Sequence, residues 1–250
     1  MSNKLANVNM CQKIIVLGDV HANFGRLNDF ITKEKPDIIL QCGDFGWWPH
    51  YHNITTTDER LFFNQYALNP KETKIFWCDG NHENHEDLQS RLKAGRKPLE
   101  IPVPGCFYMP RGSILRLDDG RNVLFFGGAY SIDKKYRQEG VSWWAEEIPT
   151  ESDFIYAEEQ IQMHGGKIEV VISHTAPTPF LDTFVTSEKI YDPSVEFLNR
   201  ILEKYRPARW YFGHFHSFHE GEFEGCKWQA LADMRAQDRW FAELSAGGVS

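Results

Sequence analysis

Side chains of metal-binding type stand where short apolar runs of the sequence end. An Asp, Asn or His follows five such runs, and in four of them a glycine directly precedes it. The residues are Asp19, His21, Asp44, Asn81, His174, His214 and His216. In open α/β sheets, ligands bind in the crevice beyond the carboxyl ends of the strands. We therefore expect these side chains to meet at one site.

The number and types of these donors indicate a metal centre. Asp19 and His21 are separated by one residue, as are His214 and His216, so an extended backbone points each pair to one side. Seven oxygen and nitrogen donors are too many for one transition metal and fit two ions that share a bridging carboxylate. Four histidines disfavour Ca²⁺ and an all-oxygen Mg²⁺ site. They favour two divalent transition-metal ions, with Mn²⁺ as the first choice and Fe, Zn²⁺, Co²⁺ or Ni²⁺ as alternatives.

The apolar runs that must position these donors predict buried strands. Most of them are continuous rather than alternating, which is typical of central strands covered on both faces. The expected strands are 13–17, 37–41, 74–78, 114–117, 122–126, 168–172 and 210–212, with more alternating ones at 218–223 and 227–231. Helical spacing predicts helices at 23–33, 58–68, 151–164 and from residue 192. This order predicts an α/β fold, and we expect one domain over residues 1–250 with its motif core at 13–216.

Two long connections, 45–57 and 130–149, are rich in aromatic residues and lack periodicity. Loops of this length in a compact domain are commonly functional. In the second connection, Arg137 is a candidate for gripping a phosphate on the substrate, and Trp143 is a candidate platform for stacking a base. We expect Trp144 to pack in the core.

Composition limits the possible classes of protein. The chain has 250 residues, of which 42% are hydrophobic and 25% charged, so it is expected to be globular rather than disordered. No apolar run is long enough to span a membrane, and the first residues do not resemble a secretory signal, so we expect a cytoplasmic protein. A net charge of −8 argues against binding of long duplex nucleic acid. Five cysteines without a CxxC pair are expected to be buried, reduced thiols.

The blocks GDVH, GD, GNHE, SHTAP and GHFH, taken in this order, make the sequence similar to the calcineurin-like metallophosphoesterase superfamily. The resemblance implies a calcineurin-like four-layer β-sandwich flanked by helices, with a dinuclear metal site at the carboxyl ends of the strands. It implies that Asp44 bridges the two metals. It assigns Asp19, His21, Asp44 and His216 to one metal and Asp44, Asn81, His174 and His214 to the other.

The resemblance also implies a phosphoester hydrolase in which His82 faces the phosphoryl group and the leaving oxygen. Two cations about 3.5–4 Å apart can bind and deprotonate a shared water. We therefore expect a metal-bridging hydroxide to attack phosphorus in line while His82 assists the leaving group. The expected substrate is a small phosphomonoester or phosphodiester, and nucleotide-like molecules fit because aromatic loops can stack on bases.

Two alternatives stay open. One is a Ser/Thr phosphoprotein phosphatase, although the second block reads GDFGWWP and lacks the arginine of that branch. The other is a non-catalytic interaction module that uses metals only to stiffen its strand ends. Of the neighbours of His82, Glu83 is expected to be a first-turn helix acid and His85 to lie on a solvated helix face.

Overall fold

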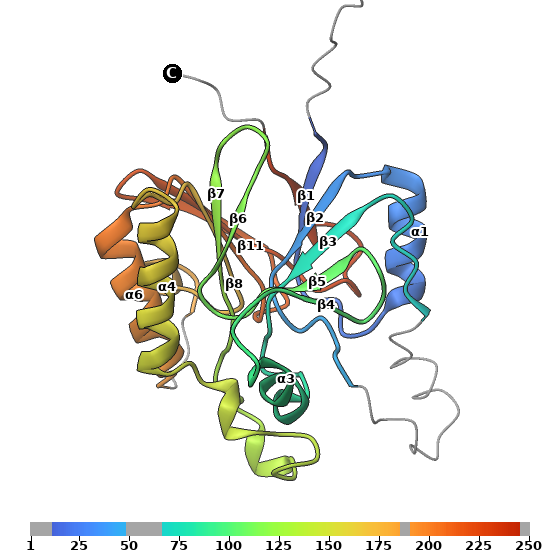
Figure 1. Cartoon of the computed structure of the whole chain (residues 1–250), viewed down its shortest axis with the longest axis horizontal. Coiled ribbons are helices and arrows are strands. Elements are labelled where there is room, and N and C mark those ends of the chain that lie inside the picture. The colour runs from blue at the N-terminus through green and yellow to red at the C-terminus, as the bar shows by residue number, and fades with distance from the viewer. Residues whose placement is uncertain (1–11, 49–66, 186–190, 246–250) are drawn as a thin grey trace, which may run out of the picture.

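Two six-stranded sheets packed face to face form the centre of the protein (Figure 1). The computed structural model describes residues 12–48, 67–185 and 191–245. Almost all of the expected helix at 58–68, and residues 49–57 of the first long connection, lie outside the described residues. The fold class is α/β, as the sequence predicts.

The first sheet has the strand order β12-β1-β2-β3-β5-β4. Its four inner strands run parallel, and both edge strands are antiparallel to their neighbours. The strands are β1 (Ile14–Leu17), β2 (Ile38–Gln41), β3 (Lys74–Trp77), β4 (Leu99–Glu100), β5 (Cys106–Tyr108) and β12 (Phe241–Glu243).

The second sheet has the order β10-β11-β9-β8-β7-β6 and repeats this plan, with parallel inner strands and antiparallel edges. Its strands are β6 (Ser113–Arg116), β7 (Asn122–Phe126), β8 (Val170–Ser173), β9 (Arg209–Phe212), β10 (His219–Phe223) and β11 (Cys226–Ala230).

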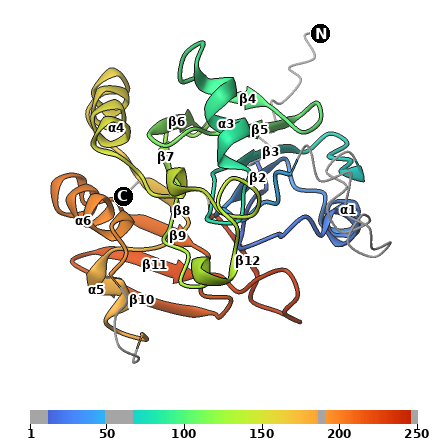
Figure 2. The same cartoon turned by 90° about the horizontal axis from the view of Figure 1, so that it is seen from below.

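Helices cover the outer face of each sheet and give four layers, which confirms the expected sandwich (Figures 1 and 2). α1 (Phe24–Glu34) lies outside the first sheet, while α4 (Glu151–Met163) and α6 (Ser194–Tyr205) lie outside the second. The shorter helices are α3 (His85–Leu92) and α5 (Thr178–Leu181), with 3₁₀ turns η3 (Lys134–Tyr136) and η4 (Ala145–Glu147).

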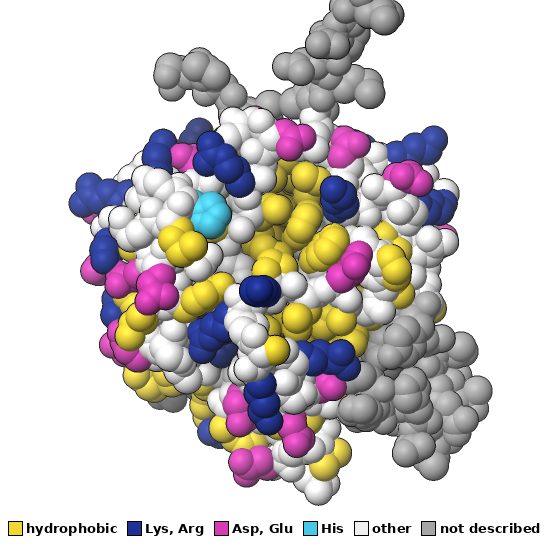
Figure 3. Space-filling model, in the orientation of Figure 1, with side chains coloured by type: hydrophobic (Ala, Val, Ile, Leu, Met, Phe, Trp, Pro, Cys, Tyr) yellow, Lys and Arg dark blue, Asp and Glu magenta, His cyan; other side chains and the backbone are white. Residues whose placement is uncertain are grey.

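The continuous apolar strands are explained by this layering, because successive side chains enter different layers of the core. Ile15 and Leu17 of β1 pack towards α1, whereas Ile14 and Val16 pack between the two sheets. The core between the sheets joins residues of both, such as Val16 and Phe125. On the face shown in Figure 3, apolar side chains gather along the middle of the molecule.

Several elements lie outside the sequence prediction. β5 and β12 are three residues long and exist through their pairing with β3 and β1. α3 is a polar helix with a single buried leucine, Leu88. The four described cysteines are buried and free. No helix in the described part of the chain has the length and apolar character to cross a bilayer.

Candidate metal centre

The expected donors all lie at one end of the two sheets. α3, which follows β3, and the segment 130–149, which follows β7, both lie beneath the sheets in Figure 1, at the end seen in Figure 2. The first sheet supplies four donors from the ends of β1, β2 and β3, and the second supplies three from the ends of β8 and β9. They are Asp19, His21, Asp44 and Asn81 from the first sheet, and His174, His214 and His216 from the second.

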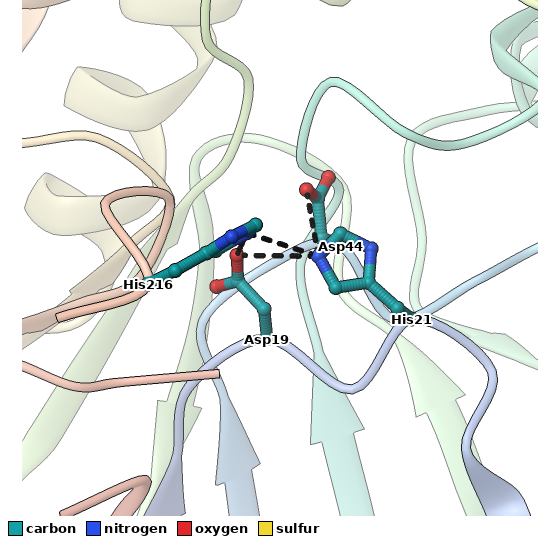
Figure 4. A group of neighbouring side chains, drawn as sticks. All are labelled: Asp19, His21, Asp44 and His216. Atoms are coloured by element: carbon teal, nitrogen blue, oxygen red, sulfur yellow. Dashed lines mark hydrogen bonds and ion pairs between the residues drawn. The ribbon is translucent and has the colours of Figure 1, made fainter. Parts of the chain in front are cut away.

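The first set of donors, shown in Figure 4, consists of Asp19, His21, Asp44 and His216, whose ligand atoms all lie within 4.8 Å of one another. His216 Nε2 lies 2.9 Å from Asp19 Oδ2 and 3.1 Å from His21 Nε2. His21 Nε2 lies 3.7 Å from Asp19 Oδ2 and 3.8 Å from Asp44 Oδ2. Two carboxylates and two imidazoles thus converge on one point.

The second set consists of Asp44, Asn81, His174 and His214. Asn81 Oδ1 lies 3.0 Å from His174 Nε2 and 3.1 Å from His214 Nδ1, and these two nitrogens are 3.3 Å apart. His174 Nε2 is also 3.3 Å from Asp44 Oδ1. The two oxygens of Asp44 therefore face different sets, which is the arrangement a bridging carboxylate requires.

The geometry and chemistry of both sets fit divalent transition metals. Ligands held at 2.0–2.2 Å from one ion, as imidazole and carboxylate ligands are, lie about 3 Å apart at right angles and about 4 Å apart across the ion. The separations given above, 2.9–3.8 Å, lie in this range. Asp19 Oδ2 is buried, and the nearby ring nitrogens of His216 and His21 are themselves donors of the first set. Mixed imidazole, carboxylate and amide donors suit Mn²⁺, Fe, Zn²⁺, Co²⁺ or Ni²⁺.

Further hydrogen bonds fix which atom of a donor faces the centre. The ring of His174 has its Nδ1 2.8 Å from the carbonyl oxygen of Cys42, so Nε2 is the nitrogen that faces the second set. Behind the first set, the Asp233 carboxylate lies 3.3 Å from His216 Nδ1 and is itself held by Arg235 at 2.6 Å. Such partners orient the ring and make it a better ligand.

The amide of Asn81 is oriented by Ser131, which is itself held by Glu147. Asn81 Nδ2 donates to Ser131 Oγ at 3.0 Å, and that hydroxyl donates to Glu147 Oε2 at 2.6 Å. The Ser131 amide also donates to Glu147 Oε1 at 2.8 Å. Because its NH₂ group is held in this way, Asn81 presents its carbonyl oxygen to the two histidines of the second set.

Four of the donors have left-handed backbone conformations, which non-glycine residues rarely adopt. Their φ angles are 46° at His21, 51° at Asp44, 68° at His214 and 53° at His216. The extended backbone assumed for His214 and His216 is absent, yet both rings reach the centre, one in each set. Strained backbone of this kind persists where the surrounding structure holds it, and it is concentrated at functional sites.

The glycines that precede the donors permit close contact between neighbouring loops. A Cβ atom on Gly80 would lie 2.1 Å from Asp44 Oδ1, and one on Gly213 would lie 2.0 Å from Asp19 Oδ1. A side chain at either position would therefore displace a carboxylate of the centre.

His82 lies next to both sets without belonging to either. Its backbone amide donates to Asp44 Oδ1 at 2.8 Å, and its ring centre is 5.3 Å from that of His21. Burial lowers the pKa of His82 to about 4, and the neighbouring Arg137 charge acts in the same direction. Arg137 Nη2 lies 2.5 Å from His82 Nε2 and 3.1 Å from His82 Nδ1, and Asp133 holds the same guanidinium at 2.9 Å.

The electrostatics of the donors reflect their burial and their crowding. Burial opposes ionisation of Asp44, but the charge of His174 outweighs it and holds the pKa of that carboxyl well below its usual range. The same pair raises the pKa of His174 to about 10, despite its burial. Burial and the His174 charge lower the pKa of His214 to about 3. A cation held here would therefore take the place of a proton on His174.

Of the two residues expected to contact substrate, Arg137 lies beside the metal centre and Trp143 does not line its cavity. Arg137 lies against His82, as described above. Trp143 is half-buried beneath the Lys134 ammonium, 5.3 Å from its ring centre, and is not among the residues that line the cavity at the metal centre. Trp144 is buried, as expected, and packs 5.5 Å from Trp48.

The predictions for Glu83 and His85 are wrong. α3 begins at His85 with Asn84 as its N-cap, so Glu83 precedes the helix. Glu83 is fully buried and accepts hydrogen bonds from the amides of Gly46 at 3.0 Å and Gly80 at 2.6 Å. Burial and the nearby Asp44 charge raise the pKa of Glu83 to about 8. His85 is only 1% exposed, and its burial lowers its pKa to about 4.

Sequence reasoning did not find the residues that hold the donors in place. Arg111 pairs with Asp79 at 2.5 Å, and its Nη2 also donates to the carbonyls of Glu146 and Glu147 at 2.9 Å. It thereby ties the end of β3 to the segment that carries Arg137. The only sequence signal was the position of Asp79, directly before the block GNHE.

The sequence matches a known family, and the fold resembles solved structures. The family model of the calcineurin-like phosphoesterases matches residues 12–218. No curated protein matches the sequence. The structure of TT1561 of Thermus thermophilus superposes with a TM-score of 0.55 at 11% identity, over 89% of this chain and 89% of that one.

Two further solved structures resemble the fold less closely. Phosphopantetheinyl hydrolase from Mycobacterium tuberculosis has a TM-score of 0.48 at 11% identity, over 93% of this chain and 96% of its own. A putative 5'-nucleotidase from Staphylococcus aureus has a TM-score of 0.47 at 15% identity, over 88% of this chain and 48% of its own. At these identities the likeness is one of fold alone.

Proposed function

The chain belongs to the calcineurin-like phosphoesterase family, and from this premise we propose that it is a dinuclear metal-dependent phosphoester hydrolase. The observation that carries the proposal is the pair of donor sets that share Asp44, with His82 beside both. A binding module would need the metal ligands alone. The partly buried His82 imidazole, which lies next to the ligands without being one of them, supports a catalytic role.

We propose that two divalent transition-metal ions, Mn²⁺ first among the candidates, occupy the centre. Asp19, His21, Asp44 and His216 would hold one ion, and Asp44, Asn81, His174 and His214 the other. Bound there, the ions would supply an acidified water as nucleophile and positive charge for the phosphoryl oxygens.

The chain's own groups would position the reaction. His82 lines the cavity at the metal centre, and its backbone is held between Asp44 Oδ1 and the Trp48 indole, whose Nε1 donates to the His82 carbonyl at 2.9 Å. The guanidinium of Arg137 can only donate, and its Nη2 lies against both ring nitrogens of His82. In the proposed reaction, His82 would give a proton to the leaving oxygen.

The proposed substrate is a small phosphomonoester or phosphodiester, with nucleotide-like molecules among the candidates. The Ser/Thr phosphoprotein phosphatase alternative receives no support from the cavity, because no arginine is present among its described lining residues. The protein is proposed to act in the cytoplasm.

Hydrolysis of 4-nitrophenyl phosphate and bis(4-nitrophenyl) phosphate tests the proposal. The protein is stripped with chelator and assayed with and without Mn²⁺, beside Asp44→Asn, His82→Ala and the matched control Asp29→Asn on the exposed side of α1. We expect Mn²⁺-dependent turnover in the wild type and the control, and at least a 100-fold loss in both site variants. If Mn²⁺ raises the melting temperature and no phosphoester is hydrolysed, the non-catalytic module is favoured. Retained turnover in folded, metal-loaded Asp44→Asn would refute the assigned mechanism.

A further inference from the structure

Two donors of the second set lie beyond the part of the first sheet that fixes β2 and β3 against each other. The register between these strands ends at the last residue of each. Asp44 lies in the segment that follows β2, residues 42–48, here called the β2 loop. Asn81 lies in the segment that follows β3, residues 78–84, here called the β3 loop. The relative position of the two donors therefore depends on contacts between these loops.

The carboxyl group of Glu83 joins the two loops. Its Oε1 accepts from the Gly46 amide of the β2 loop at 3.0 Å, and its Oε2 accepts from the Gly80 amide of the β3 loop at 2.6 Å. Gly46 follows Asp44 closely, and Gly80 directly precedes Asn81. Because Glu83 is fully buried, water cannot replace either acceptor without a rearrangement.

The loops that Glu83 joins meet at the bridging carboxylate. Asp44 Oδ1 accepts from the His82 amide of the β3 loop at 2.8 Å. The backbone of Gly80 lies so near that a Cβ atom there would be 2.1 Å from the same oxygen. This is also the oxygen that faces the second set, 3.3 Å from His174 Nε2. Its position therefore depends on how the β3 loop is held.

From these contacts we infer that Glu83 is a positioning residue, which holds the bridging Asp44 and the ring of His82 in one fixed relation to the second donor set. It acts through the backbone of the two loops and belongs to neither set. Glutamine in its place would keep the size of the side chain but offer one acceptor oxygen, so one buried amide would face an NH₂ group that can only donate. Relief of that contact requires the loops to move against each other. The inference rests on the proposed function only for its effect on turnover.

Mn²⁺ binding and the magnetic coupling of the bound ions test the inference without any turnover. Two Mn²⁺ ions that share a carboxylate are magnetically coupled, and their EPR spectrum depends on the geometry of the bridge. In Glu83→Gln we expect the coupled spectrum to change. We also expect the Mn²⁺ affinity, measured by calorimetry, to fall roughly 10- to 100-fold, as it does when other groups that orient metal ligands are lost.

Two control variants separate positioning from a general loss of stability. Glu169 also accepts from a backbone amide, that of Asn122 at 2.9 Å, but it lies before β8, at the end of the sheet away from the centre. Leu202 is buried in α6, and its truncation destabilises the fold without contact to either loop. Glu169→Gln and Leu202→Ala should both keep the wild-type spectrum and kcat. Glu83→Gln should lose at least tenfold in kcat at saturating Mn²⁺.

Glu83→Asp is the second variant if Glu83→Gln does not fold. It keeps both oxygens but is one methylene shorter, so it cannot reach both amides, and the same changes are expected. An unchanged spectrum with Mn²⁺ affinities within twofold of wild type in a folded Glu83 variant would overturn the inference, as would the same spectral change in Leu202→Ala. An uncoupled wild-type spectrum would overturn it as well, since no shared bridge would exist. A spectral change confined to the Glu83 variants, in a protein that hydrolyses no ester, would support the positioning role and count against the proposed function.

Discussion

The orientation of the Asn81 amide should depend on the hydroxyl of Ser131, and Ser131→Ala tests this. In the wild type, the hydroxyl accepts from Asn81 Nδ2 and gives its own proton to Glu147. If the amide were flipped, its buried carbonyl would face a hydroxyl with no proton left to donate. Ser131→Ala removes this discrimination, so both amide orientations become accessible and only one of them can bind a metal.

The expected magnitude follows from the cost of a buried, unsatisfied polar group, which is about 1–3 kcal/mol. Loss of a group that orients a ligand lowers metal affinity by roughly 10- to 100-fold, which is the same range. Ser131 is fully buried, so water cannot replace the lost partner without a rearrangement.

Calorimetric titration of the chelator-stripped protein with Mn²⁺ measures the effect. One of the two binding events should weaken by this factor in Ser131→Ala, while the other is retained because the first donor set does not include Asn81. Ser113→Ala is a matched control, because it also removes a buried hydroxyl, one without a hydrogen-bond partner among the described residues. If both affinities in Ser131→Ala stay within twofold of wild type, the reasoning about Asn81 is refuted.

Three other expectations concern stability and metal affinity. Arg111→Met leaves the Asp79 carboxylate buried without its partner. In urea denaturation this should lower the free energy of unfolding by about 3–5 kcal/mol, and adding Asp79→Asn should restore part of that loss. A loss below about 1 kcal/mol would contradict this prediction. The folded-state pKa of His85, about 4, lies below its ordinary value of 6.5, so the unfolded chain takes up the proton first as the pH falls. Between pH 6.5 and 4, the free energy of unfolding of the metal-free wild type should therefore drop by up to about 3 kcal/mol more than that of His85→Gln. Parallel pH profiles for the two proteins would show that burial of His85 does not cause this pH dependence. Asp233→Asn should weaken Mn²⁺ binding roughly 10- to 100-fold through His216, with the unfolding of metal-free protein unchanged as the control.

The sequence predicted those features of the centre that depend on local pattern. Continuous apolar runs mark the inner strands because both faces of each sheet are covered, and donors directly after such runs meet because parallel strands end together. The spacing of His214 and His216 correctly placed both at the centre, but for a reason that the structure does not bear out. It assumes an extended backbone, whereas both residues are left-handed.

The features that the sequence did not predict depend on contacts between distant segments. Glu83 looks like a helix acid, but it turns inward because the amides of Gly46 and Gly80 both need an acceptor. Ser131 orients Asn81 from 50 residues away, and no local pattern marks it. Likewise, β12 forms only because the end of the chain returns to pair with β1.

Because each donor set draws on both sheets, the centre can report whether two halves of the protein have assembled. A cut near Arg111 would separate the first sheet, apart from its edge strand β12, from the second sheet. The N-terminal fragment would hold Asp19, His21, Asp44 and Asn81, and its partner the three remaining histidines. Neither fragment carries a complete coordination set, and the later one must also return β12 to β1. High-affinity metal binding by the mixture would therefore show that the two fragments have assembled with their sheets correctly packed, so the pair could be used as a split-protein sensor.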